Sequence, residues 1–187
     1  LFSFNSPQGM CPTCSGLGEI YTFDPNLLVT DPEKSFRDGC IELVGKWKDL
    51  GRWKRHIFQG VADWADRKFG VDEGTMLEAP WNTLTKEQQK IWLYGAGDAH
   101  ITYTWRGGAT PIKYGGKWAG VIPELLSKHR QTKSPSHLAA MEKYMSVLHC
   151  GDCEGERLLP QARHVRIKTA SPAFRDAPEK SLPQVCD

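Results

Sequence analysis

Four of the six cysteines stand in two pairs whose spacing suits a metal ion. One pair reads Cys11-Pro-Thr-Cys14-Ser-Gly and the other Cys150-Gly-Asp-Cys153-Glu-Gly, so both follow the pattern Cys-x-x-Cys-x-Gly. A two-residue gap lets a tight turn direct both sulfurs toward one ion, and glycine permits the backbone conformation that such a turn needs. Zinc prefers four ligands in a tetrahedral arrangement, which two pairs of thiolates supply. We therefore predict one structural Zn²⁺ ion, bound by Cys11, Cys14, Cys150 and Cys153.

The other residues that could carry chemistry form weaker patterns. Cys40 and Cys186 are isolated, and we interpret them as unpaired thiols. His149 adjoins Cys150 and is an alternative metal ligand. The histidines form no His-x-x-x-His pair, and the carboxylates and nucleophiles form no catalytic arrangement. We therefore expect no enzyme activity from this segment itself.

Basic side chains are concentrated in the middle of the chain, although the formal net charge is only +2. Within residues 106–133 the single acidic residue is Glu124, and Trp105, Tyr114 and Trp118 are interleaved with the basic residues. Lys and Arg bind DNA phosphates without reading the bases, and aromatic rings can stack on exposed bases. The alternative is a solvated basic surface above ordinary core aromatics. The candidate DNA contacts are Arg106, Lys113, Lys117, Lys128, Arg130 and Lys133, with Lys54 and Arg55 as a second, weaker set.

Local patterns predict the elements that position the basic residues. Apolar residues recur every four positions over 52–69, which indicates a helix. Thr85 and Gln88 fit the capping box of another helix, which is expected to end at Gly95. Alternating residues over 100–105 and a second run over 112–118 predict a hairpin of two strands.

Three further elements are expected beside the cysteine pairs. A strand is predicted over Glu19–Phe23, shortly after Cys14. Ser134 as N-cap and Pro135 at the first helical position predict a helix whose apolar face extends to Leu148 and leads directly to Cys150. A last strand is predicted over Arg163–Thr169 from its alternating residues.

These elements predict an α+β fold with a discontinuous base. More than 130 residues separate the two cysteine pairs, so a shared metal ion would close a large loop. We therefore expect a zinc-stapled base formed by residues 1–44 and 146–187, with an inserted α+β lobe over residues 45–145 that contains helices and an antiparallel hairpin. No run of eighteen apolar residues occurs, so no membrane span is expected.

Several motifs are distributed along the chain: Phe2-Ser-Phe-Asn-Ser-Pro7, Cys11-x-x-Cys14-x-Gly16-Leu-Gly18, Phe23-Asp-Pro25, Ala79-Pro-Trp81, Leu93-Tyr-Gly95 and Cys150-x-x-Cys153-x-Gly155-x-Arg157-Leu158. Together they resemble the motifs of the UvrA family, the damage-recognising ABC-type ATPase subunits of the bacterial UvrABC excision nuclease. The resemblance implies that this sequence is an internal piece of a longer protein. It would comprise a zinc module, with the four paired cysteines as ligands, and an insertion domain that touches DNA.

The resemblance also implies a setting for the longer protein. Its partner would be damaged double-stranded DNA in nucleotide excision repair, as part of the SOS response. It would be a cytoplasmic homodimer that docks UvrB, the next component of the excinuclease, through a domain absent from this sequence. ATP would be bound only in the missing parts, because this sequence contains no Gly-x-x-x-x-Gly-Lys-Ser/Thr loop.

Three other functions compete with this hypothesis. A structural, zinc-stabilised spacer would orient neighbouring domains without direct DNA contact. A peptide-binding module is suggested by DnaJ-type chaperones, which repeat the Cys-x-x-Cys-x-Gly motif, but four times at short intervals. A thiol–disulfide enzyme would need one such pair at a helix start after a strand, whereas the present pairs lie among turn residues.

Overall fold

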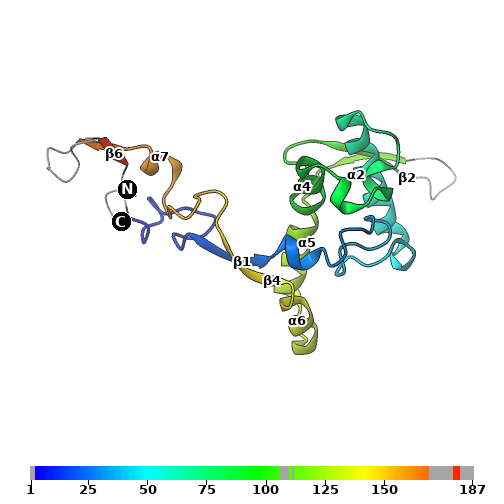
Figure 1. The fold of residues 1–187 in the computed structure, drawn as a ribbon, viewed down its shortest axis with the longest axis horizontal. Helices are drawn as coiled ribbons and strands as arrows, with labels where there is room; N and C mark the ends of the chain where they lie inside the picture. Colours follow the sequence, from blue (N-terminus) through cyan, green and yellow to red (C-terminus); the bar gives the residue numbers. More distant parts are fainter. Residues whose placement is uncertain (1–2, 106–109, 111, 169–178, 182–187) are drawn as a thin grey trace. The chain divides into compact units, whose positions relative to one another are not determined.

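The computed structural model describes residues 3–105, 110, 112–168 and 179–181. It divides into two compact units: residues 1–22 with 146–187 form unit 1, and residues 23–145 form unit 2. The described parts of both units combine helices with two-stranded sheets, so the predicted α+β class is confirmed (Figure 1). Within the described ranges, no helix combines the length and apolar character needed to cross a membrane.

Unit 1 is built around a pair of hydrogen-bonded strands. β1 spans Glu19–Phe23, as predicted, and pairs with β4, which spans Met145–His149 (Figure 1). The short helix α7 (Pro160–Arg163) precedes a small antiparallel pair, β5 (Arg166–Lys168) and β6 (Glu179–Ser181). The strand predicted over Arg163–Thr169 is therefore too long at its start, because the helical turn of α7 includes Arg163. Thr169 lies outside the described residues.

The helix predicted from Ser134 to Leu148 is wrong in its second half. α6 spans only Pro135–Glu142, with Pro135 at its first position and no side-chain cap bond from Ser134. The chain then enters β4, whose partner β1 lies more than 120 residues earlier. This long-range backbone pairing outweighs the apolar spacing that suggested a continuous helix.

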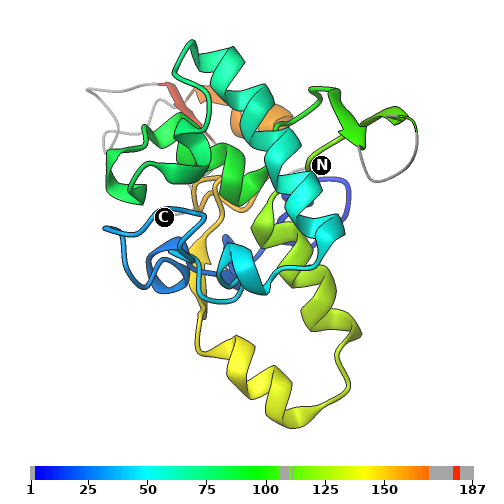
Figure 2. The same ribbon diagram turned by 90° about the vertical axis from the view of Figure 1, so that its right-hand side faces the viewer.

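Unit 2 contains the remaining elements. These are α1 (Pro25–Leu28), η1 (Trp47–Asp49), α2 (Arg52–Phe69), α3 (Thr75–Glu78), η2 (Trp81–Thr83), α4 (Lys86–Tyr94), β2 (Ile101–Trp105), β3 (Ile112–Gly116), α5 (Val121–Gln131) and α6. The predicted helix over 52–69 is confirmed as α2. Figure 2 shows α6 in yellow, extending away from the packed helices of this unit, and Met141 is the residue that it buries.

Two local predictions in unit 2 are confirmed in detail. Thr85 accepts a hydrogen bond from the Gln88 backbone, and the Gln88 side chain accepts one from the Thr85 backbone, so the capping box of α4 is complete. β2 and β3 form the predicted antiparallel hairpin, with Ile101 opposite Gly116 and Trp105 opposite Ile112. β3 ends before Trp118, however, because the chain turns inward there.

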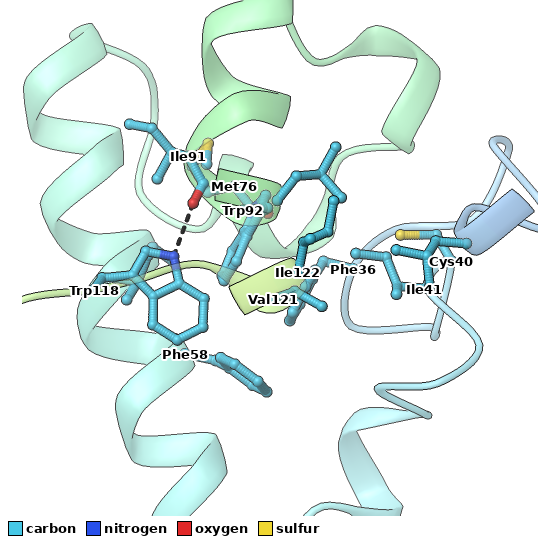
Figure 3. Close-up of a cluster of buried hydrophobic side chains, with 14 of the residues drawn as sticks. Phe36, Cys40, Ile41, Phe58, Met76, Ile91, Trp92, Trp118, Val121 and Ile122 are labelled. Atoms are coloured by element: carbon cyan, nitrogen blue, oxygen red, sulfur yellow. Dashed lines mark hydrogen bonds between the residues drawn. The ribbon is translucent and has the colours of Figure 1, made fainter. Parts of the chain in front are cut away.

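The core of unit 2 is organised around stacked aromatic rings (Figure 3). The rings of Phe36 and Trp92 stack with centroids 3.8 Å apart, and Phe58 meets Trp92 edge-on at 6.0 Å. Trp118 is also buried, and its Nε1–H donates to the carbonyl oxygen of Ile91 over 2.8 Å. The sequence analysis did not predict helix α5, which follows Trp118 and buries three of its residues in this core.

Residues 23–44, which the sequence analysis assigned to the base, contribute to the core of unit 2. Phe23, Leu28, Phe36, Cys40 and Ile41 are all buried there. The contacts therefore place the first division of the chain after Thr22 and the second after Met145. The assignment of a zinc-stapled base and an inserted lobe as functional domains stays a prediction.

Candidate metal centre and nucleic-acid interface

The four paired cysteines come together in unit 1 and are all buried. The Sγ atoms of Cys11 and Cys150 are 3.9 Å apart, and those of Cys14 and Cys153 are 3.7 Å apart. All four sulfurs lie within 4.8 Å of one another. A regular tetrahedron with metal–sulfur bonds of about 2.3 Å places its sulfurs about 3.8 Å apart. The cluster therefore has the size and the donor atoms of a closed four-thiolate metal site.

Both cysteine motifs adopt the same backbone turn, here called a knuckle. Ser15 and Gly16 have φ angles of 51° and 77°, and Glu154 and Gly155 have φ angles of 51° and 85°. Positive φ favours glycine, which accounts for the glycine that ends each motif. At Gly16 a side chain is also excluded sterically, because a Cβ atom would lie 1.9 Å from the Phe4 carbonyl oxygen.

Main-chain and arginine hydrogen bonds join the two knuckles. The Cys11 N–H donates to the Arg157 carbonyl oxygen over 2.8 Å, and the Cys150 N–H donates to the Gly18 carbonyl oxygen over 2.9 Å. The Arg157 Nε–H donates to the Gly16 carbonyl oxygen over 2.7 Å, and its guanidinium lies 3.9 Å from the Phe4 ring centroid. Arg157, which follows the second knuckle, thus binds the first knuckle and joins the two.

A second arginine supports the second knuckle from outside the motif. Arg163 donates to the carbonyl oxygens of Asp152 (3.0 Å) and Cys153 (3.5 Å), and its guanidinium pairs with Glu156 at 3.3 Å. Sequence reasoning missed the positioning role of this residue, and of Arg157 beyond its place in a motif. No local pattern connects Arg157 to Gly16, which lies 141 residues away, or Arg163 to the carbonyl groups 10 and 11 residues before it.

The cluster holds thiols of different acidity. Burial raises the pKa of the Cys153 thiol to about 12. Burial also acts on Cys14, but hydrogen bonds, first from the Gly18 N–H at 3.2 Å and then from neighbouring thiols, outweigh it and set the pKa of Cys14 at about 7. A metal ion would displace the remaining protons, because only thiolates coordinate.

The other predicted thiol and imidazole candidates lie elsewhere. Cys40 is free and fully buried in unit 2, where burial raises its pKa to about 12. Among the residues that the structure describes, the group suited to a metal contains the four paired cysteines and does not include His149. Cys186 lies outside the described residues.

The basic candidates come from separate parts of unit 2. Lys113 is exposed on β3 opposite Thr104, while Lys128, Arg130 and Lys133 are exposed at the end of α5 and just beyond it. Lys54 pairs with Glu124 at 2.8 Å and Lys117 with Asp98 at 2.7 Å, so carboxylates partly neutralise both. Arg106 lies outside the described residues.

Arg55 lines a groove of about 910 Å³ beside α2 and β2. The first turn or two of α2 contributes Arg52, Arg55 and His56 to this groove. Farther along α2 the groove is lined by acidic residues. Sequence reasoning missed Arg52, although it stands next to the apolar stripe of this helix. The described residues that line it are Trp47, Arg52, Arg55, His56, Gln59, Gly60, Asp63, Asp66, Arg67, Val71, Glu73, Thr102, Thr104 and Trp105.

Comparison with known proteins identifies the class of protein. Residues 24–143 match the family described as the UvrA DNA-binding domain, and the chain belongs to this family. The predicted resemblance is thereby confirmed.

Two relatives are named UvrABC system protein A. That of Xanthomonas axonopodis pv. citri (strain 306) is 37% identical over 171 residues, which are 89% of this chain and 16% of that protein. That of Escherichia coli (strain K12) is 36% identical over 180 residues, which are 94% of this chain and 18% of that protein. The chain thus spans less than a fifth of the length of these relatives.

A solved structure has a similar fold. The crystal structure of UvrA2 from Deinococcus radiodurans aligns with a TM-score of 0.59 and 24% sequence identity, over 87% of this chain and 20% of that chain. This likeness concerns the fold and extends over most of the chain.

Proposed function

We propose that this chain is the DNA-contacting part, with its zinc module, of a UvrA-type protein, and that it contributes to damage recognition in nucleotide excision repair. The observation that carries the proposal is the family match over residues 24–143, which covers nearly all of unit 2. Relatives named UvrABC system protein A support the repair setting.

The cysteine cluster supports the proposed zinc ion. Four buried sulfurs at tetrahedral spacing fit Zn²⁺, which prefers closed thiolate sites. Cys14 lies five residues before β1 and Cys150 directly follows β4, so the ion would fix the two strands through which the chain enters and leaves unit 2. Its role would be structural, and it would take no part in catalysis.

Basic residues on unit 2 support the proposed DNA contact. Damage occurs in any sequence, so a damage sensor needs contacts to phosphates and to DNA shape rather than to particular base edges. Lys113, Lys128, Arg130 and Lys133 are exposed and suited to such contacts. Arg55 in the groove, the paired Lys54 and Lys117, and Arg106 remain candidates.

The remaining parts of the proposal concern the longer protein. By analogy with its family, it would be a cytoplasmic, homodimeric ABC-type ATPase that binds damaged double-stranded DNA and the excinuclease component UvrB. ATP binding and UvrB docking would both reside in segments outside this sequence.

The DNA contact is tested by fluorescence anisotropy with labelled duplex at low salt. Neutralising Lys128, Arg130 and Lys133 together by substitution with Gln should weaken binding and reduce the slope of log K against log salt by up to about 3, since each phosphate contact contributes about 0.9. The matched control replaces Lys86, Lys90 and Lys143 with Gln, which removes the same charge from exposed positions.

Two results would contradict the proposal. Wild-type protein that binds neither intact nor damaged duplex at low salt would favour the spacer. Binding of unfolded polypeptide without DNA binding would favour the peptide-binding module.

A further inference from the structure

An aromatic cluster covers the start of α2 and the adjoining hairpin. Trp53 lies parallel to Tyr114, with centroids 5.9 Å apart and an interplanar angle of 10°, and its centroid is 5.7 Å from that of Trp105. His56 meets Trp105 edge-on at 5.0 Å, and its Nε2 atom lies 3.0 Å from the Tyr114 hydroxyl oxygen. Three separate elements therefore hold these rings in fixed relative orientations.

Trp53 is exposed in spite of these contacts. Its exposed fraction is 56%, whereas Trp81, Trp92 and Trp118 are between 0% and 6% exposed. A tryptophan that only stabilised the fold would gain by burying its ring fully, since apolar area removed from water contributes about 25 cal/mol per Å². Trp53 instead combines a supported ring with a large solvent-facing surface, which is the geometry of a stacking platform.

Positive charge accompanies the exposed ring. The Arg52 guanidinium lies 5.1 Å from the Trp105 ring centroid, and Arg55 lines the adjoining groove. Within the described part of the chain, neither arginine forms an ion pair. Both are therefore available to an anionic group beside the rings.

The groove also limits the length of backbone that these arginines can attract. Toward the C-terminal end of α2 and just beyond it, the lining includes Asp63, Asp66 and Glu73, with Arg67 as the one cation there among the residues that the structure describes. A phosphate backbone would be repelled from the acidic end and favoured over the first turn of the helix. The charge pattern thus fits a short stretch of one strand better than a long tract of duplex.

We propose that Trp53 stacks on an unpaired DNA base while Arg52 and Arg55 hold the neighbouring phosphates. This inference rests on the proposed DNA contact and specifies the ligand as a nucleotide that has left the duplex stack. Bases within a duplex have both faces covered, whereas an unpaired base offers a free face to an aromatic ring. This patch of Trp53, Arg52 and Arg55 would therefore distinguish locally opened DNA from intact duplex.

The sequence analysis left open whether Trp105, Tyr114 and Trp118 stack on bases or belong to the core. Trp118 cannot stack on a base, since it is buried and its Nε1–H is hydrogen-bonded to the Ile91 carbonyl oxygen. Trp105 and Tyr114 instead contact Trp53, which lies in the helix that the sequence predicted over residues 52–69.

The experiment measures anisotropy of the 187-residue chain with three labelled DNAs of equal length. These are an intact duplex, a duplex with an unpaired thymine bubble, and single-stranded oligo-dT. Trp53→Ala should weaken binding to the bubble and the single strand at least about fivefold, because stacking on an aromatic ring contributes that much per base, and should change duplex binding less than about twofold. Trp53→Phe should recover most of the loss. Tyr94→Ala is the matched control, because Tyr94 is 48% exposed but lies outside the patch.

The outcomes separate this inference from the proposed function. If wild-type protein binds DNA and Trp53→Ala binds the bubble equally well, the stacking platform is refuted and the DNA contact stands. Equal losses on all three DNAs would also refute it. If wild-type protein binds none of them, the proposed function itself fails. Photo-crosslinking of wild-type protein to 5-iododeoxyuridine in the bubble tests the contact without a variant, and crosslinks that map away from Trp53 would overturn the inference.

Discussion

Removal of the metal ion is expected to unfold unit 1 and leave unit 2 folded. The perturbation is a zinc chelator or the substitution Cys153→Ala, which removes one of the four ligands. Unit 1 buries few apolar side chains besides the ligands: its described buried cluster consists of the four cysteines with Ile20 packed against them, and Leu158 and Ala162 are its other buried apolar residues in the described ranges. Unit 2 has a separate, much larger aromatic and aliphatic core, which contains no predicted ligand.

The size of the effect follows from the loop that the metal closes. Its ligands are 139 residues apart in sequence, and a cross-link of that span would contribute about 5 kcal/mol if the whole chain unfolded together. If unit 2 stays folded, its ends remain joined by the hydrogen bond from the Asp24 N–H to the Tyr144 carbonyl oxygen. For Cys11 and Cys150 only residues 12–23 and 145–149, about 17 in all, then complete the loop, and the contribution falls to about 3 kcal/mol.

The positions of the tryptophans provide the assay. All seven tryptophans lie between residues 47 and 118, so tryptophan fluorescence during urea unfolding reports unit 2. Amide hydrogen exchange at Cys11 and Cys150, whose N–H groups join the two knuckles, reports unit 1. Chelation should leave the urea midpoint by fluorescence unchanged and accelerate exchange at these two amides about 100-fold, the equivalent of about 3 kcal/mol.

A matched cysteine variant should give the opposite pattern. Cys40→Ala removes a buried thiol from unit 2, so it should lower the fluorescence-detected midpoint while one metal ion per chain is retained. The prediction is refuted if chelation lowers the urea midpoint detected by fluorescence in addition to accelerating exchange at the Cys11 and Cys150 amides. It is equally refuted if the Cys11 and Cys150 amides keep their protection without metal.

Three further predictions concern single groups. Trp118→Phe should lower the free energy of unfolding of unit 2 by about 1 kcal/mol, because it removes the buried hydrogen bond from the Trp118 Nε1–H to the Ile91 carbonyl oxygen, which keeps the Gly95 N–H as its remaining donor. Asp66→Ala should lower it by about 2 kcal/mol, because the Asp66 carboxylate accepts from the backbone N–H groups of Gly74 and Met76. Urea unfolding monitored by tryptophan fluorescence measures both changes in free energy. The number of protons released per zinc ion should rise as the pH falls through about 7, because Cys14 becomes protonated there and must then also lose a proton. Calorimetric titration in buffers of different ionisation enthalpy measures this number.

Each of these predictions has a result that contradicts it. Unchanged stability in Trp118→Phe would mean that the hydrogen bond from the indole N–H does not stabilise unit 2. A loss in Asp66→Asn as large as in Asp66→Ala would contradict the acceptor role, because the amide oxygen of Asn can still accept one of the two bonds. Proton release that stays constant between about pH 6 and 8 would show that Cys14 is not the acidic thiol.

Local sequence signals predicted a large part of the fold. The apolar repeat of α2, the capping box at Thr85 and the alternation of the hairpin each depend on neighbours within a few residues, and each is confirmed. The sequence analysis did not predict α5, and the apolar spacing after residue 142 suggested a helix where the structure has the strand β4. In the second case the deciding partner of β4 lies more than 120 residues away.

For the candidate sites, the sequence by itself determined the donor atoms. Two matching knuckles specify four thiols at metal-ligand spacing, because each turn is a local structure in which a glycine with positive φ ends the motif. Only the tertiary structure decided that the four sulfurs meet, and that Arg157 holds one knuckle from the other. It also decided which tryptophan faces solvent, since Trp118 is buried by helices that contribute nothing to its local pattern and Trp53 is not. Burial depends on what the whole chain packs against a residue, and a local pattern cannot contain that.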